Sequence, residues 1–480
     1  MGVPISADAI RAMFLARLSE MCKAEMPRYR AMTAVVARVN EDVLAARPEV
    51  AKDRMGHGAG LDIERHGAVR VGTAAELVLL RRLFAVMGMT PVGYYDLSVA
   101  GLPVHSTAFR PTTEAALRQS PFRVFVSLLR LDMLQAELRG EVAAILARRS
   151  LSTPRGLELL DRFEAEGGFN EGDAREFVGE ALETFRWRPQ ATVSIDVYRR
   201  LHGAHPLLAD ICCFKGPHIN HLAAPTLDID AVQRDLKAGG FEPKEIIEGP
   251  PRRRCPILLR QTSYKAVAEP IDFPAQPGSQ LMHTARFGEV EQRGLALTNE
   301  GRALYDRLLS DTLTNASEPL APSSAAAYEQ ELSRQFEAFP DEHAALWTKG
   351  LAHFQYRSAC EGVGRSGGPQ TRTSIESLLA EGRLSIEPIL YEDFLPASAA
   401  GIFRSNLAHR AEAEYLGRAN RESFEDALGC AVIDPQSLYA AIEAQSLAAC
   451  LKALDLPRTL PRLKESGGCS FGRREASSQG

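Results

Sequence analysis

Apolar residues near the start of the chain recur at three- and four-residue steps. Over residues 7–26 they are Ile10, Met13, Phe14, Leu18 and Met21. A period near 3.6 residues is typical of an amphipathic helix, so the chain is expected to open helically. Thr73 and Glu76 have the spacing of a capping box, and Gly88 offers an end to the helix that would follow them.

Short apolar runs bounded by proline, glycine or polar residues predict strands. They lie at residues 91–98, 211–214, 256–268 and 285–297, and extended structure is expected to continue over 218–222. No internal repeat is evident. Strand, helix and several strands in this order indicate an α+β fold rather than a regular βαβ repeat.

Helical spacing dominates two further stretches. Between residues 112 and 185 it is carried by Val124, Leu128, Leu131, Met133, Leu134 and Leu138. We expect this stretch to be a helical insertion that forms a wall or lid. Helices are also expected over residues 300–380, where the core candidates are Leu304, Leu308, Phe336, Leu346 and Phe354.

The pattern divides the chain into six regions. They are an N-terminal helix with a first polar cluster (1–110), a helical insertion (111–200), a β-rich core (201–300), a helical region (301–385), a mixed C-terminal region (386–465) and a flexible tail (466–480). Because 480 residues exceed what one compact core usually holds, two or three structural units are expected, which could share one continuous sheet.

Composition excludes several classes of protein. Hydrophobic residues make up 45% of the chain and charged residues 24%, and both fractions are typical of a soluble globular protein. A net charge of -5 gives no overall positive field for nucleic acid, and the short basic run at 252–254 is interpreted as a solvated turn. We therefore expect no nucleic-acid partner.

Cysteine use and hydropathy suggest a compartment. The eight cysteines include no CxxC pair, which favours reduced thiols in a cytoplasm. The N-terminus lacks the apolar core of a signal peptide, and no stretch approaches the roughly 18 apolar residues of a membrane span. We expect a cytoplasmic protein without a membrane partner.

Three polar clusters, far apart in sequence, carry the candidate chemistry. They lie at residues 64–70, 218–221 and 287–294 and together hold histidine, carboxylate and arginine. Two imidazoles and one carboxylate form the facial triad of non-heme Fe(II) oxygenases, which leaves coordination positions open for substrate and dioxygen. A nearby arginine suggests an anionic substrate.

The first cluster contains His66 and Arg70. A spacing of four residues places both side chains on one face of either a strand or a helix, so they could serve one cavity. The alternative is a surface histidine and arginine that pair with the nearby acids Asp62 and Glu64.

The second cluster contains His218 and His221. A helix would bring these residues together, whereas a strand would send them to opposite faces. Pro217 and the alternation of apolar residues favour a strand, so only one of them is expected to be a metal ligand. The alternative is a pair of core or capping histidines.

The third cluster contains Glu289, Glu291 and Arg293, which share one face if the segment is a strand. Two carboxylates on a half-buried face require cations, and Arg293 could satisfy one while a metal satisfies the other. The alternative is an exposed polar edge strand. Spacing alone does not choose between Glu289 and Glu291 as the ligand.

These clusters, together with residues 213–221 and the segment 391–401, resemble the 2-oxoadipate dioxygenase/decarboxylase family, also called 2-hydroxyglutarate synthases. The resemblance extends over residues 14–460. The family is related to the vicinal-oxygen-chelate enzymes, whose β-rich modules curl around one metal. The resemblance therefore implies an α+β fold with such a core and large helical insertions.

The resemblance also assigns roles to residues. It places His66, His221 and Glu289 at the iron-ligand positions, with His66 also in contact with substrate. Arg70 takes the position that holds a substrate carboxylate, and Ala397 and Ser398 fall in a substrate-contact loop in which relatives carry a bulkier aliphatic residue at the position of Ala397. Supporting roles fall to His218, Glu291 and Arg293.

The activity that the resemblance implies is the Fe(II)-dependent oxidative decarboxylation of 2-oxoadipate to 2-hydroxyglutarate and CO2 in lysine breakdown. The partners would be a small-molecule 2-oxo dicarboxylate and O2. Two alternatives use a similar cavity: a glyoxalase-type lyase or isomerase with a redox-inert metal, and a non-catalytic metabolite-binding protein. Oxygen uptake separates the first from a dioxygenase, and the presence of all three candidate ligands argues against the second.

Overall fold

A computed structural model describes residues 4–48, 60–98, 101–274, 278, 281–315, 325–358, 374–395 and 420–457. The chain forms two compact units. The first comprises residues 1–352 and 390–438, and the second comprises residues 353–389 and 439–480. The predicted substrate contacts Ala397 and Ser398 lie outside the described residues.

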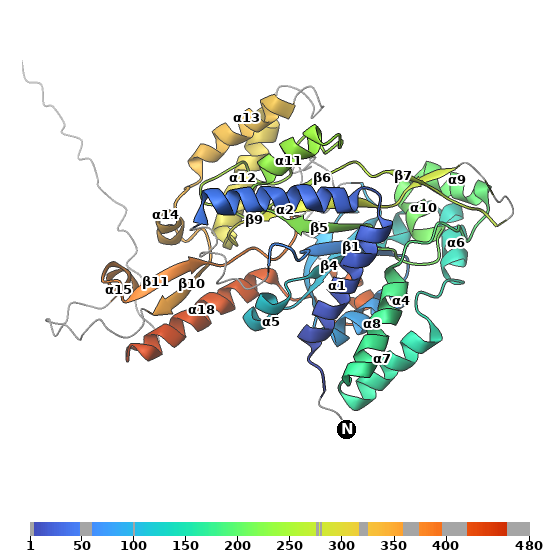
Figure 1. Ribbon diagram of the computed structural model, residues 1–480, viewed down its shortest axis with the longest axis horizontal. Helices are drawn as coiled ribbons and strands as arrows, with labels where there is room; N and C mark the ends of the chain where they lie inside the picture. The colour runs from blue at the N-terminus through green and yellow to red at the C-terminus, as the bar shows by residue number, and fades with distance from the viewer. Residues whose placement is uncertain are drawn as a thin grey trace, which may run out of the picture. The chain divides into compact units, whose positions relative to one another are not determined.

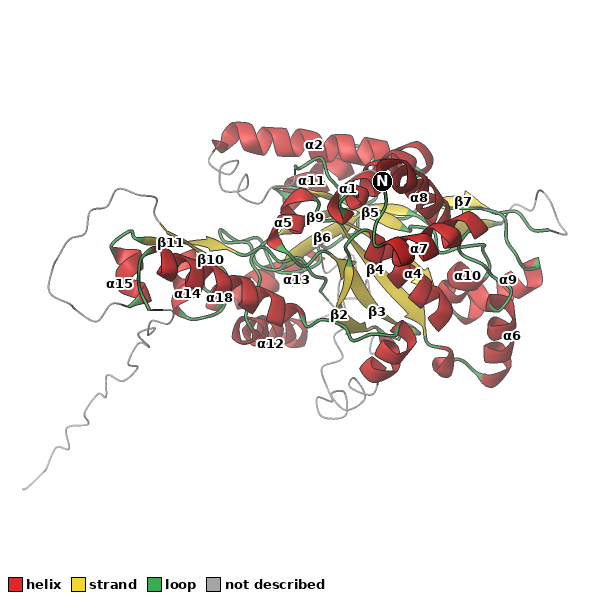
Figure 2. Ribbon diagram, turned by 90° about the horizontal axis from the view of Figure 1, so that it is seen from below, coloured by secondary structure: helices red, strands yellow, loops and turns green. Residues whose placement is uncertain are grey.

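The first unit is built on a curled seven-stranded sheet (Figures 1 and 2). In spatial order its strands are β2 (Thr90–Asp96), β3 (Val104–Arg110), β4 (Arg123–Leu129), β1 (His66–Val71), β5 (His221–Pro225), β9 (Phe287–Arg293) and β6 (Leu259–Ser263). A separate short hairpin consists of β7 (Ala268–Pro270) and β8 (Met282–Thr284). The predicted α+β fold with a β-rich core is confirmed.

Helices surround this sheet in the first unit. They include α1 (Ala7–Glu25), α2 (Tyr29–Ala46), α4 (Ala74–Val86), α5 (Glu114–Gln119), α6 (Ala136–Leu146), α7 (Pro154–Glu166), α8 (Glu171–Phe185), α9 (Ile195–Ala204), α10 (Pro206–Cys212), α11 (Ile229–Ala238), α12 (Asn299–Asn315), α13 (Ala325–Gln335) and α14 (His343–Thr348). Short 3-10 turns lie at Leu131–Met133 and Phe336–Ala338. The predicted opening helix and the helix capped by Thr73 are confirmed as α1 and α4.

The two faces of the sheet have different neighbours. On the outer face, sheet residues such as Val69, Val126 and Val290 pack into one core with α1, α2, α4, α8 and α11. Figure 1 shows α2 running across β5 and β9 on this side. The opposite face carries His66 and Phe125, and we call it the inner face. On the inner face, Val104 and Phe125 pack into a second core with α6, α9 and α10. The polar side chains of His66 and Glu289 lie on this same face.

The second unit contains an antiparallel pair, β10 (Phe354–Ser358) and β11 (Leu384–Pro388), with α15 (Ile375–Ala380). It also holds α18 (Pro435–Ala453) from Tyr439 onward. Inside this unit His353 Nδ1 lies 2.8 Å from Glu443 Oε2. The helical prediction for residues 300–380 was wrong at Phe354, which is a buried strand residue.

Two other predictions of local structure were also wrong. Residues 123–129, which we assigned to a helical insertion, form β4, a strand buried on both faces. Such a strand reads as a continuous apolar run and lacks the alternation that separates strand from helix. Residues 211–214 were expected to be a strand, but α10 extends to Cys212, with Pro206 in its first turn and His205 as its cap.

The sheet contains an internal repeat that the sequence did not reveal. One half consists of β1, α4 and then β2 to β4, with β1 pairing in parallel with β4. The other consists of β5, α11, β6 and β9, with β5 pairing in parallel with β9. The two halves meet at the antiparallel pair β1 and β5. The amino-acid sequence, in which no repeat is evident, therefore conceals one that strand pairing shows.

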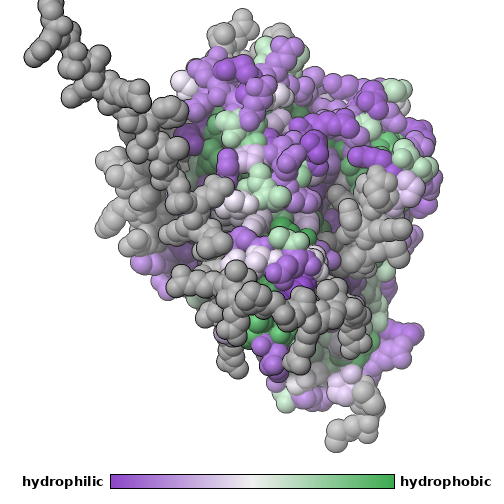
Figure 3. Space-filling view, turned by 90° about the vertical axis from the view of Figure 1, so that its left-hand side faces the viewer, coloured by the Kyte–Doolittle hydropathy of each residue, from purple (hydrophilic) through white to green (hydrophobic). Residues whose placement is uncertain are grey.

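Hydrophilic side chains predominate on the face of the molecule in Figure 3. Among the described residues, the large hydrophobic side chains that are exposed are Met133, Leu157, Val267 and Met282. Within the described part of the chain, no helix combines the length and the hydropathy that crossing a membrane requires.

Candidate active site

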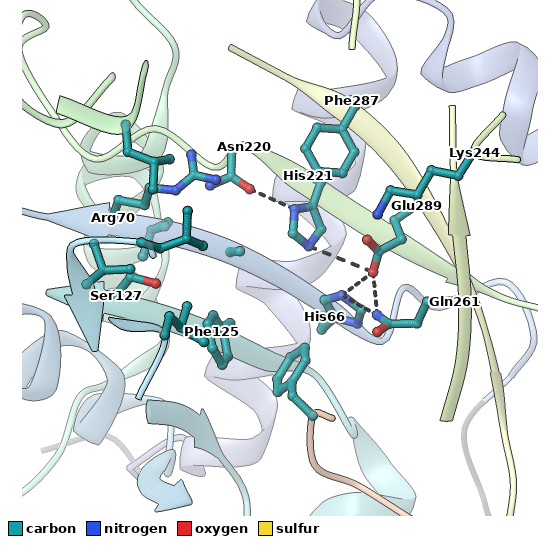
Figure 4. A pocket seen from close by; sticks show the side chains of 17 residues that line it. His66, Arg70, Phe125, Ser127, Asn220, His221, Lys244, Gln261, Phe287 and Glu289 are labelled. Atoms are coloured by element: carbon teal, nitrogen blue, oxygen red, sulfur yellow. Dashed lines mark hydrogen bonds and ion pairs between the residues drawn. The ribbon is translucent and has the colours of Figure 1, made fainter. Parts of the chain in front are cut away.

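Three candidate metal ligands come together on the inner face of the sheet. His66 and His221 are the first residues of the adjacent strands β1 and β5, and the register places His66 opposite Ala223. Ala223 also lies opposite Glu289 on β9, so all three candidate ligands share one face. Their ligand atoms lie within 4.8 Å of one another. Figure 4 shows the three side chains pointing toward a common centre.

Both ring nitrogens of His66 face carboxylates. Nε2 lies 2.8 Å from Glu289 Oε1, and Nδ1 lies 2.6 Å from Glu291 Oε2. Burial disfavours the charged imidazole, but the adjacent carboxylates outweigh burial and raise the pKa of His66. In this arrangement Glu291 fixes the orientation of the ring, while Nε2 faces the other candidate ligands.

Glu291 is itself held by two arginines. Arg123 Nη2 donates to Glu291 Oε2 at 3.0 Å, and Arg293 Nε donates to Glu291 Oε1 at 2.6 Å. Glu291 is 1% exposed, and burial would raise its pKa, but Arg123 and His66 outweigh burial and lower that pKa. The paired carboxylate is therefore a fixed support for His66.

His221 is oriented by its neighbour in sequence. Its Nδ1 lies 2.7 Å from Asn220 Oδ1, while its Nε2 lies 4.0 Å from Glu289 Oε1. The ring of Phe287 stacks on the imidazole with 4.8 Å between centroids. Burial lowers the pKa of His221 to about 3, so the ring is neutral at physiological pH and has a lone pair available for a metal.

Glu289 is a buried carboxylate that remains charged. Burial would raise its pKa, but the two histidines and Lys244 outweigh burial and lower the pKa to about 2. Gln261 on β6 donates a hydrogen bond to Glu289 Oε1. Lys244 lines the same cavity, and its Nζ lies 2.6 Å from Glu248 Oε1. Glu289 is therefore a candidate for the anionic ligand of a divalent metal.

The candidate ligands lie in a cavity of about 210 Å³ on the inner face. Part of its wall is apolar and includes Leu97, Val104 and Phe125. The ring of Phe394 also lines the cavity and packs edge-on against His66, with 4.8 Å between centroids. A polar metal site beside an apolar wall suits a small ligand that has a charged head and a methylene chain.

Arg70 reaches the same cavity from β1 (Figure 4). Its Nη1 lies 2.7 Å from Asp210 Oδ2, and the side chain is 26% exposed. Asp210 is also close to the Nε2 atoms of His283, at 3.2 Å, and His218, at 3.5 Å. Burial lowers the pKa of His218 to about 4. Asp210 therefore connects Arg70 to two buried histidines.

The structure brings most of the sequence-predicted residues together. His66, His221 and Glu289 form the cluster, and Arg70 lines the same cavity. Arg70 pairs with Asp210 and not with Asp62 or Glu64. In contrast, Glu64 is buried and accepts hydrogen bonds from Ser19 and Tyr29.

The supporting residues differ from expectation in one case. Glu291 and Arg293 contact each other on the face that was predicted, and the alternative of an exposed edge strand was wrong because β9 lies between β5 and β6. His218 precedes β5 and is not on a strand, so the argument from opposite strand faces does not apply to it. It contacts Asp210, which holds Arg70.

Sequence reasoning missed Asn220, Lys244, Gln261 and Phe125, which line the cavity beside the candidate ligands. Asn220 directly precedes a candidate ligand, and that position was a usable signal. Gln261 and Phe125 lie on strands whose register no local pattern reveals, and Lys244 lies in the connection between α11 and β6.

Comparisons with known proteins identify the family of this chain. Residues 14–406 match the protein family described as 2-oxoadipate dioxygenase/decarboxylase. A protein of that name from Pseudomonas putida is 51% identical over 455 residues, covering 94% of this chain and 98% of the relative. One from Escherichia coli is 49% identical over 453 residues, covering 94% of this chain and 99% of the relative.

A solved structure extends the similarity to the fold. The crystal structure of the hydroxyglutarate synthase from Pseudomonas putida in complex with 2-oxoadipate superposes with a TM-score of 0.88. It is 50% identical in sequence, and the match covers 95% of this chain and 100% of that one.

Proposed function

Because the chain belongs to the 2-oxoadipate dioxygenase/decarboxylase family, we propose that it is an Fe(II)-dependent dioxygenase that converts 2-oxoadipate and O2 to 2-hydroxyglutarate and CO2. The observation that carries the proposal is the convergence of His66, His221 and Glu289 in a cavity that Arg70 also lines. The proposal includes a cytoplasmic location and a role in lysine breakdown.

The donor set fits Fe(II). Two imidazoles and one carboxylate on one face of a metal are the ligands of non-heme iron oxygenases, which keep the remaining positions open. Glu291 and Asn220 hold the Nδ1 atoms of the two histidines, so both Nε2 atoms face Glu289. Bound there, Fe(II) would supply a Lewis-acidic and redox-active centre for a chelating 2-oxo acid and for O2.

The reaction balances in atoms and electrons. The bond between the carboxylate carbon and the 2-oxo carbon of 2-oxoadipate breaks, and CO2 leaves. One atom of O2 joins the former 2-oxo carbon, which becomes a new carboxylate. The other atom forms a hydroxyl group on the adjacent carbon. Each of these two oxidations releases two electrons, and together they supply the four electrons that reduce O2.

Arg70 is proposed to hold the carboxylate that is remote from the 2-oxo group. A guanidinium is a planar fork that grips a carboxylate through two charge-assisted hydrogen bonds. Asp210 contacts the fork at Nη1 and fixes its orientation in the cavity wall. The remote carboxylate would thus lie near Arg70, and the carbon chain would lie along the apolar wall.

Two further residues complete the proposed substrate contacts. Ala397 and Ser398 follow the cavity-lining Phe394 closely in sequence. On the resemblance to the family, we assign them to the substrate loop. The small side chain of Ala397 is expected to leave more room for the substrate chain than a bulkier aliphatic residue would.

Oxygen uptake by the enzyme reconstituted with Fe(II) under anaerobic conditions tests this function. Upon addition of O2 we expect 2-oxoadipate to give equimolar O2 consumption and CO2 release, with 2-hydroxyglutarate as product. 2-Oxohexanoate, which lacks the second carboxylate, is the matched control substrate and should react far more slowly. Turnover of 2-oxoadipate without O2 uptake would instead identify a lyase or an isomerase.

A further inference from the structure

The two halves of the sheet are related residue by residue at the candidate metal site. At their junction His66 lies opposite Ala223, and Ala68 lies opposite His221. In both pairs, the first residue of one strand, His66 or His221, faces the third residue of the other strand. His66 and His221 therefore occupy equivalent positions in the two halves. Each histidine also opens a strand that leads into a helix, α4 in one half and α11 in the other.

The same equivalence identifies the partner of Glu289. In the second half, Ala223 on β5 lies opposite Glu289 on the parallel strand β9. In the first half, Ala68 on β1 lies opposite Phe125 on the parallel strand β4. Since Ala68 and Ala223 are equivalent, Phe125 occupies the position in the first half that Glu289 occupies in the second.

The side chain of Phe125 has no atom that could coordinate a metal. Its side chain is 5% exposed and lines the cavity that holds the three candidate ligands. Its ring lies 4.9 Å from that of Phe394, which in turn packs against His66. The repeat thus provides two pairs of equivalent positions around the site, His66 with His221 and Phe125 with Glu289, and Phe125 is the one of the four residues without a ligand atom.

We propose that Phe125 is a positioning residue that takes the place of a fourth protein ligand and so keeps one coordination position open for the 2-oxo acid or O2. The inference rests on the proposed metal site and deepens it. Closed sites with four protein ligands are typical of structural metals, whereas catalytic sites keep a position for substrate. A carboxylate at residue 125 would occupy one of the positions that the three proposed ligands leave open.

Moving the carboxylate between the two halves tests the equivalence directly. The probe is Mn(II), titrated into the apoprotein and followed by the electron paramagnetic resonance signal of the free ion. Glu289→Phe should lose Mn(II) binding. The double variant Phe125→Glu with Glu289→Phe should regain it, to within about tenfold of the wild-type affinity, because the triad is rebuilt from the other half.

A matched control places the carboxylate elsewhere on the same strand face. In Ser127→Glu with Glu289→Phe, the new carboxylate lies one inner-face position further along β4, and no recovery is expected. The proposal is overturned if the Phe125→Glu double variant binds Mn(II) no better than this control. If Glu289→Phe alone still binds Mn(II) like the wild type, the proposed ligand set fails instead.

A single substitution keeps the inference testable if the double variant does not fold. Phe125→Glu retains the three native ligands, and water-proton relaxation by bound Mn(II) reports how many coordinated waters exchange. We expect lower relaxivity than in the wild type for Phe125→Glu and unchanged relaxivity for Phe125→Leu. Wild-type relaxivity in Phe125→Glu with Mn(II) bound would show that residue 125 does not face an open position.

Discussion

Glu291 Oε2 lies 2.6 Å from Nδ1 of His66, whereas the other ring nitrogen, Nε2, faces Glu289. The two carboxylates thus contact different nitrogens of the same imidazole ring. Glu289 lies on the same side of His66 as His221, whereas Glu291 is enclosed by Arg123 and Arg293. Residue spacing did not distinguish Glu289 from Glu291, but the geometry does: Glu289 is a candidate metal ligand, and Glu291 supports His66.

Replacing the support should weaken metal binding without abolishing it. In Glu291→Ala the metal should stay bound, with an affinity about 10- to 100-fold lower, because His66 loses the group that orients it. The variant should also be less stable by about 3–5 kcal/mol, since two buried arginines lose their carboxylate. Metal titration and urea unfolding measure the two effects, and an unchanged affinity would remove Glu291 from its supporting role.

Replacing any candidate ligand should abolish iron retention. His66→Ala, His221→Ala and Glu289→Ala each leave two ligands, which is too few to hold Fe(II) through desalting. Iron content after anaerobic reconstitution is the measurement, and His218→Ala is the matched histidine control that should keep iron. Wild-type iron occupancy in His221→Ala would show that the ligand assignment is wrong.

Arg70→Lys should impair the use of dicarboxylates with the metal site intact. Lysine keeps the charge but loses the two-pronged grip, so kcat/KM for 2-oxoadipate should fall at least about tenfold. The control variant is Arg155→Lys, which alters an arginine that pairs with Glu176 at the surface. Equal kinetics in Arg70→Lys and the wild type would place Arg70 outside the substrate site.

Asp210→Asn tests whether Arg70 must be held in place. The amide is similar in shape but removes the charge that contacts Arg70 and lies near His218 and His283. A hydrogen bond to a charged group contributes about 1.5–3 kcal/mol, so the KM for 2-oxoadipate should rise about tenfold or more while kcat and iron content change little. A fall in kcat at constant KM would contradict this positioning role.

Sequence reasoning located the candidate site well where strand parity alone decides it. The spacing of His66 and Arg70 predicts a shared face, and so does that of Glu289, Glu291 and Arg293, because a strand alternates with period two wherever it lies. In the structure His66, Arg70 and Glu289 line the cavity, and Glu291 and Arg293 contact each other on the inner face.

The remaining features depend on contacts that no local pattern contains. Arg70 and Asp210 are 140 residues apart in sequence, and their ion pair joins β1 to α10. The strand β4 is buried on both faces, so its apolar run resembles a helix as much as a strand. The internal repeat was missed because residue types such as Phe125 and Glu289 differ at equivalent positions, and only strand register relates them.

The fate of the oxygen atoms tests the central claim most directly. The Fe(II)-loaded enzyme is supplied with 2-oxoadipate under 18O2 in unlabelled water, and the 2-hydroxyglutarate is analysed by mass spectrometry. A dioxygenase that decarboxylates its substrate places one labelled atom in the new carboxylate and one in the hydroxyl group. We predict a product that carries both labels, whereas an unlabelled 2-hydroxyglutarate would contradict the proposed function.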